Sequence, residues 1–418
     1  MKKYGRDTRP YVKPVTRIEL SESNIKLRWI LIVVLLAVGV VSIMVGLTSM
    51  LNTEPGWQTV EVSVKEASCA GDFTLQYDFS QAGTGATAQF KQLTQLYSEA
   101  AVKAYRLFSP EIREEGFFNV GYLNAHVNTP VRVETELYEA LSLAASYGSR
   151  QVFTAPAVVE YNRVFLCENS EEAVLYDPAR DPENVAWLKE LGRFMSDPDM
   201  IRLELIGDDQ VQLSVAQEYL DFAGENEINV LLDFGWMKNA FIADYLASVL
   251  VQNGYTQGYL ASFDGFTRNL DDRGTVYSFN LFDRKGDEVY MPAAMEYNSP
   301  MSIVFLRDYP LGDQDRWHYY AFEDGNILTV MLDPATGLPK SGAANLVSYG
   351  NFSCGEILLR AETLFIADGL DTDALNTMAG EEIYSVWFEG WNLKYNEENL
   401  LLVKNPDGGA EKYSFTIQ

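Results

Sequence analysis

Apolar residues recur at helical spacing in four long stretches of the chain. The spacing predicts helices over residues 88–109, 134–148, 183–196 and 236–254, and Gly254 is typical of the position that follows a helix C-terminus. Shorter runs rich in β-branched and aromatic residues predict strands over residues 72–80, 201–207, 210–216, 302–308 and 383–390. Helices and hairpins follow one another without regular β-α alternation, so the pattern predicts an α+β fold of mixed helices and antiparallel strands.

One apolar stretch, residues 29–51, carries no charge and is long enough to span a bilayer as a helix. The 28 residues before it hold eight Lys and Arg against three acids, which predicts a cytoplasmic N-terminus and an extracytoplasmic remainder. We therefore expect a basic cytoplasmic leader (1–28), a transmembrane signal anchor (29–51), a stalk (52–71) and an extracytoplasmic domain (72–418). The protein would then be a single-pass protein of the cell membrane.

Charge and counts of reactive residues exclude several function classes. Beyond the leader the chain holds 24 Lys and Arg against 56 Asp and Glu, a formal charge of −32, which argues against nucleic acid or anionic lipid as its partner. Three cysteines permit one disulfide at most, and the sequence does not say which pair would form it. Two histidines, His126 and His318, are too few for a His-rich zinc site, and we expect both to be structural or exposed.

The stretch TVMLDPATGLP, residues 329–339, predicts a strand that ends in a tight turn. Asp333 can cap the turn through its side chain, Pro334 fixes φ, and Gly337 can adopt positive φ before Pro339 ends the pairing. The local chemistry by itself is that of a structural turn.

Four segments taken in order resemble the motifs of one family. Leu123 and Asn124 occur in GYLNAHVNTPVRVETELYEAL (121–141), DFGWMKNAFIADYLASVL (233–250) matches an Asp-x-Gly-Gly-x-x-Lys-Gly-x-x-x-Asp motif, and ASFDG (261–265) stands for an Asn-Leu-Gly-Gly-Asp motif. The turn at 333–339 matches Asp-Pro-x-Thr-Gly-x-Pro. Together they resemble the ApbE-like flavin transferases over most of residues 72–395. The resemblance implies an enzyme that moves FMN from FAD to a Thr or Ser of an extracytoplasmic acceptor protein with Mg²⁺.

The resemblance also implies roles for particular residues. It predicts catalytic roles for Asp333, Thr336 and Lys238. It predicts flavin-binding roles for Asn124, Asp233, Gly235, Asp244, Asp264, Gly265 and Gly337. For Mg²⁺ it gives two alternatives, Glu362 in RAETLFIADG (360–369) or Asp373 with Thr377 in TDALNT (372–377).

The chain departs from the family pattern at positions that carry chemistry. Val330 stands where the family has His, Asn239 stands for the motif Lys with Lys238 one residue early, and Trp236 replaces the second Gly. Valine cannot accept a proton from an acceptor hydroxyl, so we predict slow or absent transfer. The alternative function is a catalytically inactive relative that binds flavin or a protein partner at the cell surface. A third hypothesis makes Thr87, in GTGATA (83–88), a flavin attachment point.

Overall fold

The computed structural model describes residues 55–62 and 72–418, and the predicted leader and membrane anchor lie outside this part. Within it, no helix combines the length and hydrophobicity that crossing a bilayer requires. Residues from Glu54 onward form one folded unit of mixed helices and strands, which confirms the α+β class.

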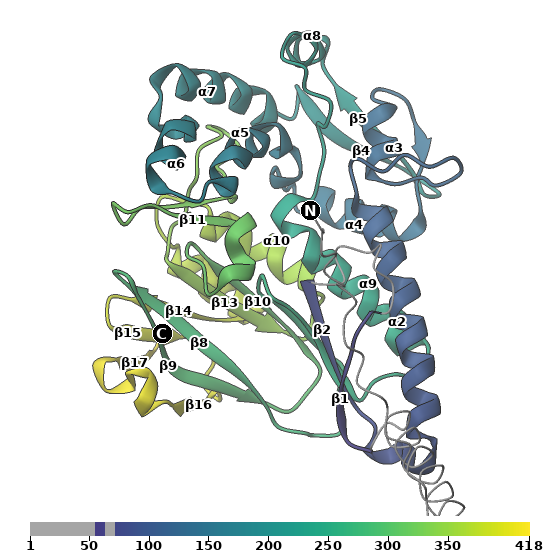
Figure 1. Ribbon diagram of the computed structural model, residues 1–418, viewed down its shortest axis with the longest axis vertical. Helices are drawn as coiled ribbons and strands as arrows, with labels where there is room; N and C mark the ends of the chain where they lie inside the picture. Colours follow the sequence, from purple (N-terminus) through teal and green to yellow (C-terminus); the bar gives the residue numbers. More distant parts are fainter. Residues whose placement is uncertain (1–54, 63–71) are drawn as a thin grey trace, which may run out of the picture. The chain divides into compact units, whose positions relative to one another are not determined.

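A nine-stranded sheet forms the centre of this unit (Figure 1). All neighbouring strands are antiparallel except β15 and β17, which are parallel. Its order is β1 (Trp57–Val60), β2 (Phe73–Asp78), β6 (Gly258–Ser262), β7 (Phe266–Asn269), β10 (Met301–Arg307), β13 (Asn345–Gly350), β14 (Tyr384–Glu389), β15 (Asn392–Tyr395) and β17 (Ser414–Ile417). β1 lies at one edge and, in the described part of the chain, pairs with β2, so residues 57–60 of the predicted stalk belong to the sheet.

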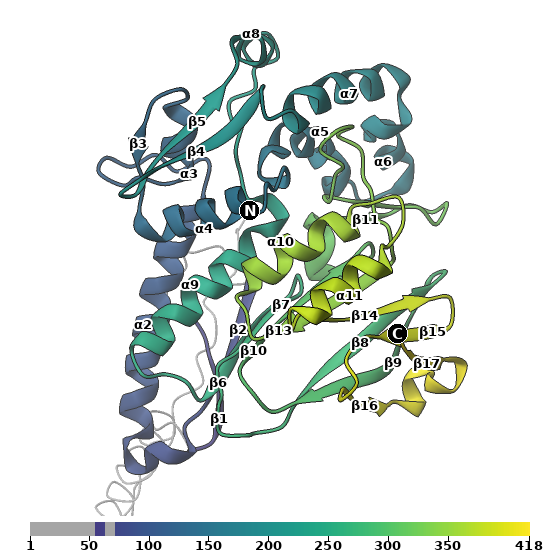
Figure 2. The same ribbon diagram turned by 180° about the vertical axis from the view of Figure 1, so that it is seen from behind.

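Helices cover one face of the nine-stranded sheet (Figures 1 and 2). They are α2 (Ala86–Phe108), α9 (Lys238–Gln252), α10 (Cys354–Phe365) and α11 (Thr372–Gly380). Apolar side chains of these helices and of the strands beneath them share the larger core. The predicted helices at 88–109 and 236–254 are thereby confirmed, with Gly254 at a φ of 81° just after α9.

A three-stranded sheet packs on part of the opposite face and encloses a second core. It consists of β16 (Leu401–Lys404), β9 (Glu288–Tyr297) and β8 (Tyr277–Lys285), in that order. Ile303 and Phe305 of β10 belong to this second core, whereas Val304 and Leu306 belong to the first. Burial on both faces explains why residues 303–306 form a continuous apolar run and not an alternating one.

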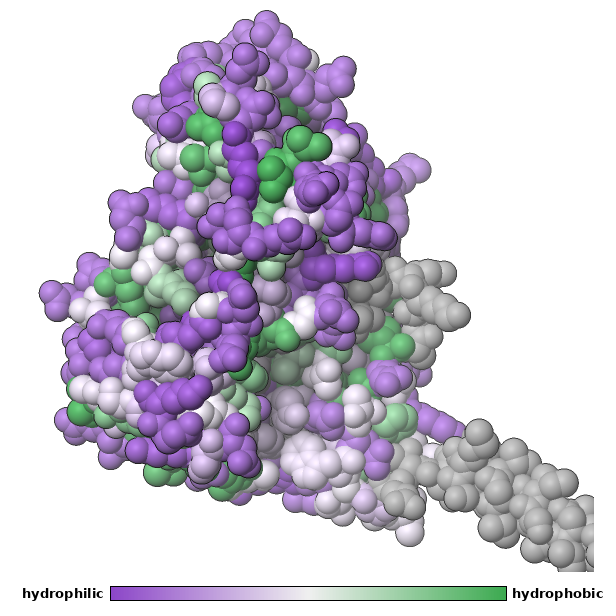
Figure 3. Space-filling model, turned by 60° about the vertical axis from the view of Figure 1, so that its left-hand side comes forward, coloured by the Kyte–Doolittle hydropathy of each residue, from purple (hydrophilic) through white to green (hydrophobic). Residues whose placement is uncertain are grey.

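The remaining elements lie at the far end of the helical layer (Figure 1). They comprise α3 (Val120–Ala125), β3 (Val131–Arg132), α4 (Thr135–Ser146), α5 (Ala155–Leu166), α6 (Ser170–Tyr176), α7 (Pro182–Ser196), β4 (Ile201–Gly207), β5 (Gln210–Val215) and α8 (Gln217–Glu225), with a small hairpin of β11 (Tyr319–Ala321) and β12 (Ile327–Thr329). Hydrophilic residues dominate the face drawn in Figure 3, and the hydrophobic ones are scattered among them. This surface agrees with the acidic composition.

Candidate functional site

Three motif segments that are far apart in the chain meet around Trp236. The indole lines a small cavity together with Asp264 of the 261–265 segment and Val330 and Met331 of the 329–339 segment. The turn at Gly235–Met237 carries Trp236 to this position directly before α9. These three segments therefore meet in the fold.

The space left at this convergence is only about 20 Å³. Trp236 is 9% exposed, and Phe305, His318 and Tyr319 add further rings to the lining. Sites that bind ligands of drug or cofactor size usually offer about 300 to 1,000 Å³. The cleft as it stands has no room for the flavin or the adenine of FAD, so these residues do not fit that cofactor.

Gln151 links Trp236 to the 329–339 segment through two hydrogen bonds. Its side-chain amide donates a hydrogen bond to the Leu332 carbonyl at 2.9 Å, and its Oε1 accepts one from the Trp236 indole at 3.3 Å. Gln151 is itself buried. Sequence reasoning missed this residue, because a contact over 181 positions leaves no local signal in the chain.

Asn124 shapes the loop that leads to Trp236. Its Oδ1 accepts hydrogen bonds from the backbone N–H groups of Leu231 and Leu232, and its amide donates to the carbonyls of Leu232 and Val120. The side chain is 7% exposed, and these four backbone contacts use its amide and carbonyl groups. In this structure the Asn124 side chain fixes the backbone of the loop before Trp236, and both of its amide N–H groups already have protein acceptors.

A buried polar cluster surrounds the start of α9. The Asn239 amide donates to Asp264 at 2.8 Å and lies 3.4 Å from Asp72, so it joins two carboxylates. Burial raises the pKa of Asp264 to about 6, and burial followed by the Asp264 charge raises the pKa of Asp72. The charge of Lys238 opposes the shift at Asp72. Lys238 thus serves as a counter-charge in this cluster.

Two other predicted residues of this loop and hairpin have backbone roles. Gly235 adopts a φ of 53° at the turn into Trp236, and Gly265 adopts a φ of 115° in the turn between β6 and β7. A Cβ at Gly265 would lie 2.4 Å from the Phe305 carbonyl oxygen, so only glycine fits there. Asp233 lies beside Lys238, and its pKa is raised by burial.

His318 and Arg307 complete the surroundings of the cluster. Arg307 forms a buried ion pair with Asp315 at 2.6 Å. Burial lowers the pKa of His318 to about 4, so the imidazole is neutral at physiological pH, and its ring stacks on Phe263. The expectation that His318 is structural or exposed agrees with this packing role, and the sequence alone did not indicate its neighbours.

The turn at 333–340 has the conformation predicted from its residues. Asp333 Oδ1 accepts a hydrogen bond from the Ala335 N–H, and Gly337 adopts a φ of 66°. The second carboxylate oxygen of Asp333 pairs with Lys340, and the Thr336 hydroxyl accepts from the Leu338 N–H. Asp333 and Thr336, which the resemblance predicts to be catalytic, therefore use these polar groups in contacts within the turn.

Asp244 stabilises the start of α10 and also lines a pocket of about 280 Å³. Its two oxygens accept hydrogen bonds from the N–H groups of Cys354 and Gly355, each at 2.8 Å. Burial raises its pKa to about 6, and these two donors counter the shift. Carboxylates at helix N-termini are stabilising for this reason.

The two alternative predictions for the magnesium site lie in different surroundings. Glu362, on α10, is 2% exposed and leaves one carboxylate oxygen without a partner, and burial raises its pKa to about 8. Asp373 and Thr377 are exposed on α11, and the Thr377 hydroxyl donates to the Asp373 carbonyl. Residues 55–62 and 72–418 contain no group of three or more His, Cys, Asp or Glu side chains suited to a metal ion. Glu362, or Asp373 with Thr377, as Mg²⁺ ligands therefore stay predictions.

The fold itself has known counterparts among solved structures. An ApbE protein from Thermotoga maritima superposes with a TM-score of 0.53 at 13% identity, covering 84% of this chain and 98% of that chain. The flavin transferase ApbE from Vibrio cholerae gives 0.51 at 13% identity, covering 82% and 95%, and a point mutant of it gives 0.51 at 12%, covering 85% and 99%. No family model and no curated protein matches the sequence. The chain has the ApbE fold over most of its length.

Proposed function

We propose that this chain is a membrane-anchored extracytoplasmic protein that uses the flavin transferase fold as a binding scaffold and does not transfer FMN. The observation that carries the proposal is the packing of Trp236 into the convergence of the motif segments, which leaves about 20 Å³. The loop is held in this form by Asn124 and Gln151.

An active FMN transferase is the second candidate. In that reaction the acceptor hydroxyl attacks the flavin-side phosphorus of FAD and AMP leaves, which requires charge neutralisation and alignment. The polar cluster of Lys238, Asn239 and Asp264 favours this candidate, because it lies at the first turn of α9 beside the motif segments. Transfer would require Trp236 to leave its place and another group to take the proton that Val330 cannot accept.

A transfer assay separates the two candidates. The full-length chain is incubated with FAD, Mg²⁺ and a peptide that carries Thr-Gly-Ala-Thr, and mass spectrometry follows the addition of FMN. We expect no adduct from the wild type or from Val330→His, because the imidazole alone does not open the cleft. An adduct formed by the wild type at ordinary enzyme rates would overturn the proposal.

Flavin titration is the companion measurement. FAD, FMN and riboflavin are added to the same full-length chain, and quenching of their fluorescence reports binding. The proposal expects no quenching that depends on Trp236. Quenching by the wild type that is lost in Trp236→Ala would place flavin against the indole and contradict the closed cleft.

The location outside the membrane is part of the proposal and rests on the sequence. Residues 29–51 act as the anchor, and the basic leader stays in the cytoplasm. Protease added to intact cells is expected to digest the acidic domain and to spare a tag at the N-terminus. Digestion of the tag and protection of the domain would reverse the orientation.

A further inference from the structure

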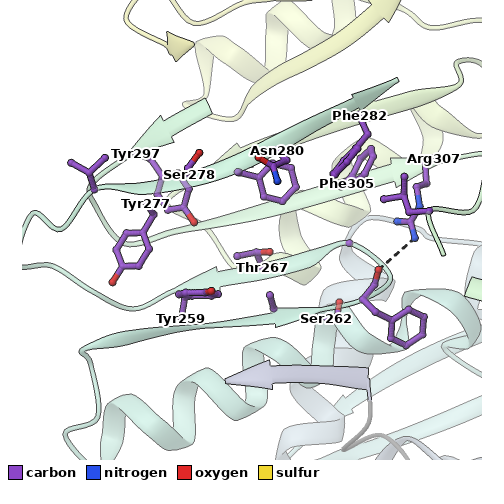
Figure 4. A pocket seen from close by; sticks show the side chains of 16 residues that line it. Tyr259, Ser262, Thr267, Tyr277, Ser278, Asn280, Phe282, Tyr297, Phe305 and Arg307 are labelled. Atoms are coloured by element: carbon purple, nitrogen blue, oxygen red, sulfur yellow. Dashed lines mark hydrogen bonds between the residues drawn. The ribbon is translucent and has the colours of Figure 1, made fainter. Parts of the chain in front are cut away.

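A groove of about 490 Å³ lies on the face of the nine-stranded sheet opposite the helices (Figure 4). β6 and β7 form one side of it, with Tyr259, Ala261 and Thr267, and β8 forms the other. The ring of Trp57, on β1, packs edge-on against Tyr277 of β8 at a centroid distance of 6.0 Å. The groove adjoins the closed cleft at Trp236, because Phe305 and Arg307 line both.

The side of the groove formed by β8 is an unpaired strand edge. In the described part of the chain β8 pairs with β9 alone. Five consecutive residues, 276–280, line the groove, so residues of both faces of the strand border it. Free strand edges present unpaired N–H and C=O groups to any further strand. β8 offers such an edge over nine residues and contains no proline.

The three-stranded sheet covers only part of the nine-stranded sheet. Leu281 and Met295 pack above Ile303 and Val347, whereas the groove stands open above β6 and β7. A strand added to β8 would lie about 4.8 Å beyond it. It would continue the second sheet across the open part of the first, in the manner of a β-sandwich.

The lining of the groove defines what such a strand would contain. It includes no carboxylate, and its only charged side chain, Arg307, is already paired with Asp315. The aromatic residues among those that line it are Tyr259, Phe263, Tyr277, Phe279, Phe282, Tyr297 and Phe305. The whole chain carries a formal charge of −27, which favours approach of a segment with basic flanks.

We infer that the groove beside β8 binds an extended peptide segment of a partner protein by strand addition. The segment has uncharged apolar or aromatic side chains at alternate positions inside the groove and Lys or Arg at its flanks. Its main chain pairs with β8, and its side chains lie against the tyrosine and phenylalanine rings. This inference deepens the proposed binding role and rests on it for the existence of a partner.

The test uses a displayed library of 12-residue peptides selected on the full-length chain. Selected peptides are expected to share alternating apolar positions with basic ends. Each is then resynthesised with alternate backbone amides N-methylated, which keeps the side chains and removes the strand donors. We expect N-methylation on one edge to weaken binding at least about tenfold, as the loss of several main-chain hydrogen bonds requires.

Two matched variants locate the binding. Ala261→Trp fills the groove and is expected to weaken the selected peptides at least about tenfold. Thr59→Trp places the same ring on the same face of the sheet two strands away, and should leave binding unchanged, because Thr59 is in register with Gln76 and Gln76 with Tyr259. Circular dichroism of both variants checks their folding.

Several outcomes would overturn the inference. They are the recovery of no peptide, equal binding to Ala261→Trp and wild type, no effect of N-methylation, and displacement of the peptides by micromolar FAD, which would assign the groove to flavin. The transfer assay is read separately. FMN transfer with intact peptide binding would defeat the proposed function alone, and absent transfer with absent peptide binding would defeat this inference alone.

Discussion

The Trp236 indole donates a hydrogen bond to the side chain of Gln151, a residue 85 positions earlier that also holds the Leu332 carbonyl. Through this one glutamine the ring is fixed to the segment that follows the family's missing histidine. The cleft is closed by a hydrogen-bonded tryptophan and not by a loosely placed side chain. The contribution of Trp236 to the free energy of unfolding can therefore be measured by truncating its side chain.

Trp236→Ala is expected to destabilise the protein by about 3 to 5 kcal/mol, because it removes a large buried ring and leaves a cavity. Urea denaturation followed by circular dichroism measures the change. Trp317→Ala is the matched control, since Trp317 is 50% exposed and should cost less than about 1 kcal/mol. Equal losses for the two variants would mean that Trp236 does not pack the cleft.

Asn124→Ala should cost about 2 to 4 kcal/mol, because it leaves the buried N–H groups of Leu231 and Leu232 without acceptors. The free energy of unfolding is measured with and without FAD and Mg²⁺, and the loss should be the same in both. Asn229→Ala, at an exposed position in the same region, is the control. A loss seen only when flavin is present would restore the flavin-binding role predicted from the sequence.

Gly265→Ala is expected to destabilise the hairpin of β6 and β7 by at least about 2 kcal/mol, since the new Cβ meets the Phe305 carbonyl at a φ of 115°. Gly369→Ala, where no atom lies within 4 Å of the added carbon, should be nearly neutral. Thermal unfolding compares them. A tolerated Gly265→Ala would show that this turn can relax.

Glu362 predicts a pH dependence of stability. Burial raises its pKa from 4.5 to about 8 in the folded state, so the protonated form is favoured on folding. The stability it contributes is complete below pH 4.5 and is lost as the pH rises through 8. Glu362→Gln keeps the shape, removes this titration and should gain about 1 to 3 kcal/mol over wild type between pH 5 and pH 8.

The measurement is the free energy of unfolding in urea at several pH values. Asp373→Asn is the control, because Asp373 is exposed on α11 and its removal should leave the slope with pH unchanged. Parallel curves for wild type and Glu362→Gln would show that Glu362 is solvated or paired in solution. Added Mg²⁺ should not shift any of the curves.

Local chemistry made some of these features predictable from the sequence. The turn at Asp333 and Gly337 depends on residues within five positions of one another, and the helix over 236–254 depends on its own periodicity. Both were predicted from the residues alone. The meeting of Trp236, Asp264 and Val330 was not predicted, because nothing local links segments so far apart.

What the cleft contains could not be predicted in the same way. A tryptophan at the start of an apolar helix has the same pattern whether it borders a cavity or fills it. Asp72 and Gln151 act through long-range contacts, which no spacing reveals. Glu362 was chosen for its carboxylate, and only the fold shows that this carboxylate is enclosed with one oxygen left without a partner.

The four-residue strand β1 also determines how the domain responds to load. Among the strands of residues 55–62 and 72–418, tension along the chain from its N-terminal side reaches β1 first, and there β1 is hydrogen-bonded to β2 alone. Peeling it away would also draw Trp57 off Tyr277, at the strand edge where we place a partner. Mechanical stretching of the N-terminal segment would then change the affinity for a bound peptide before the rest of the domain unfolds.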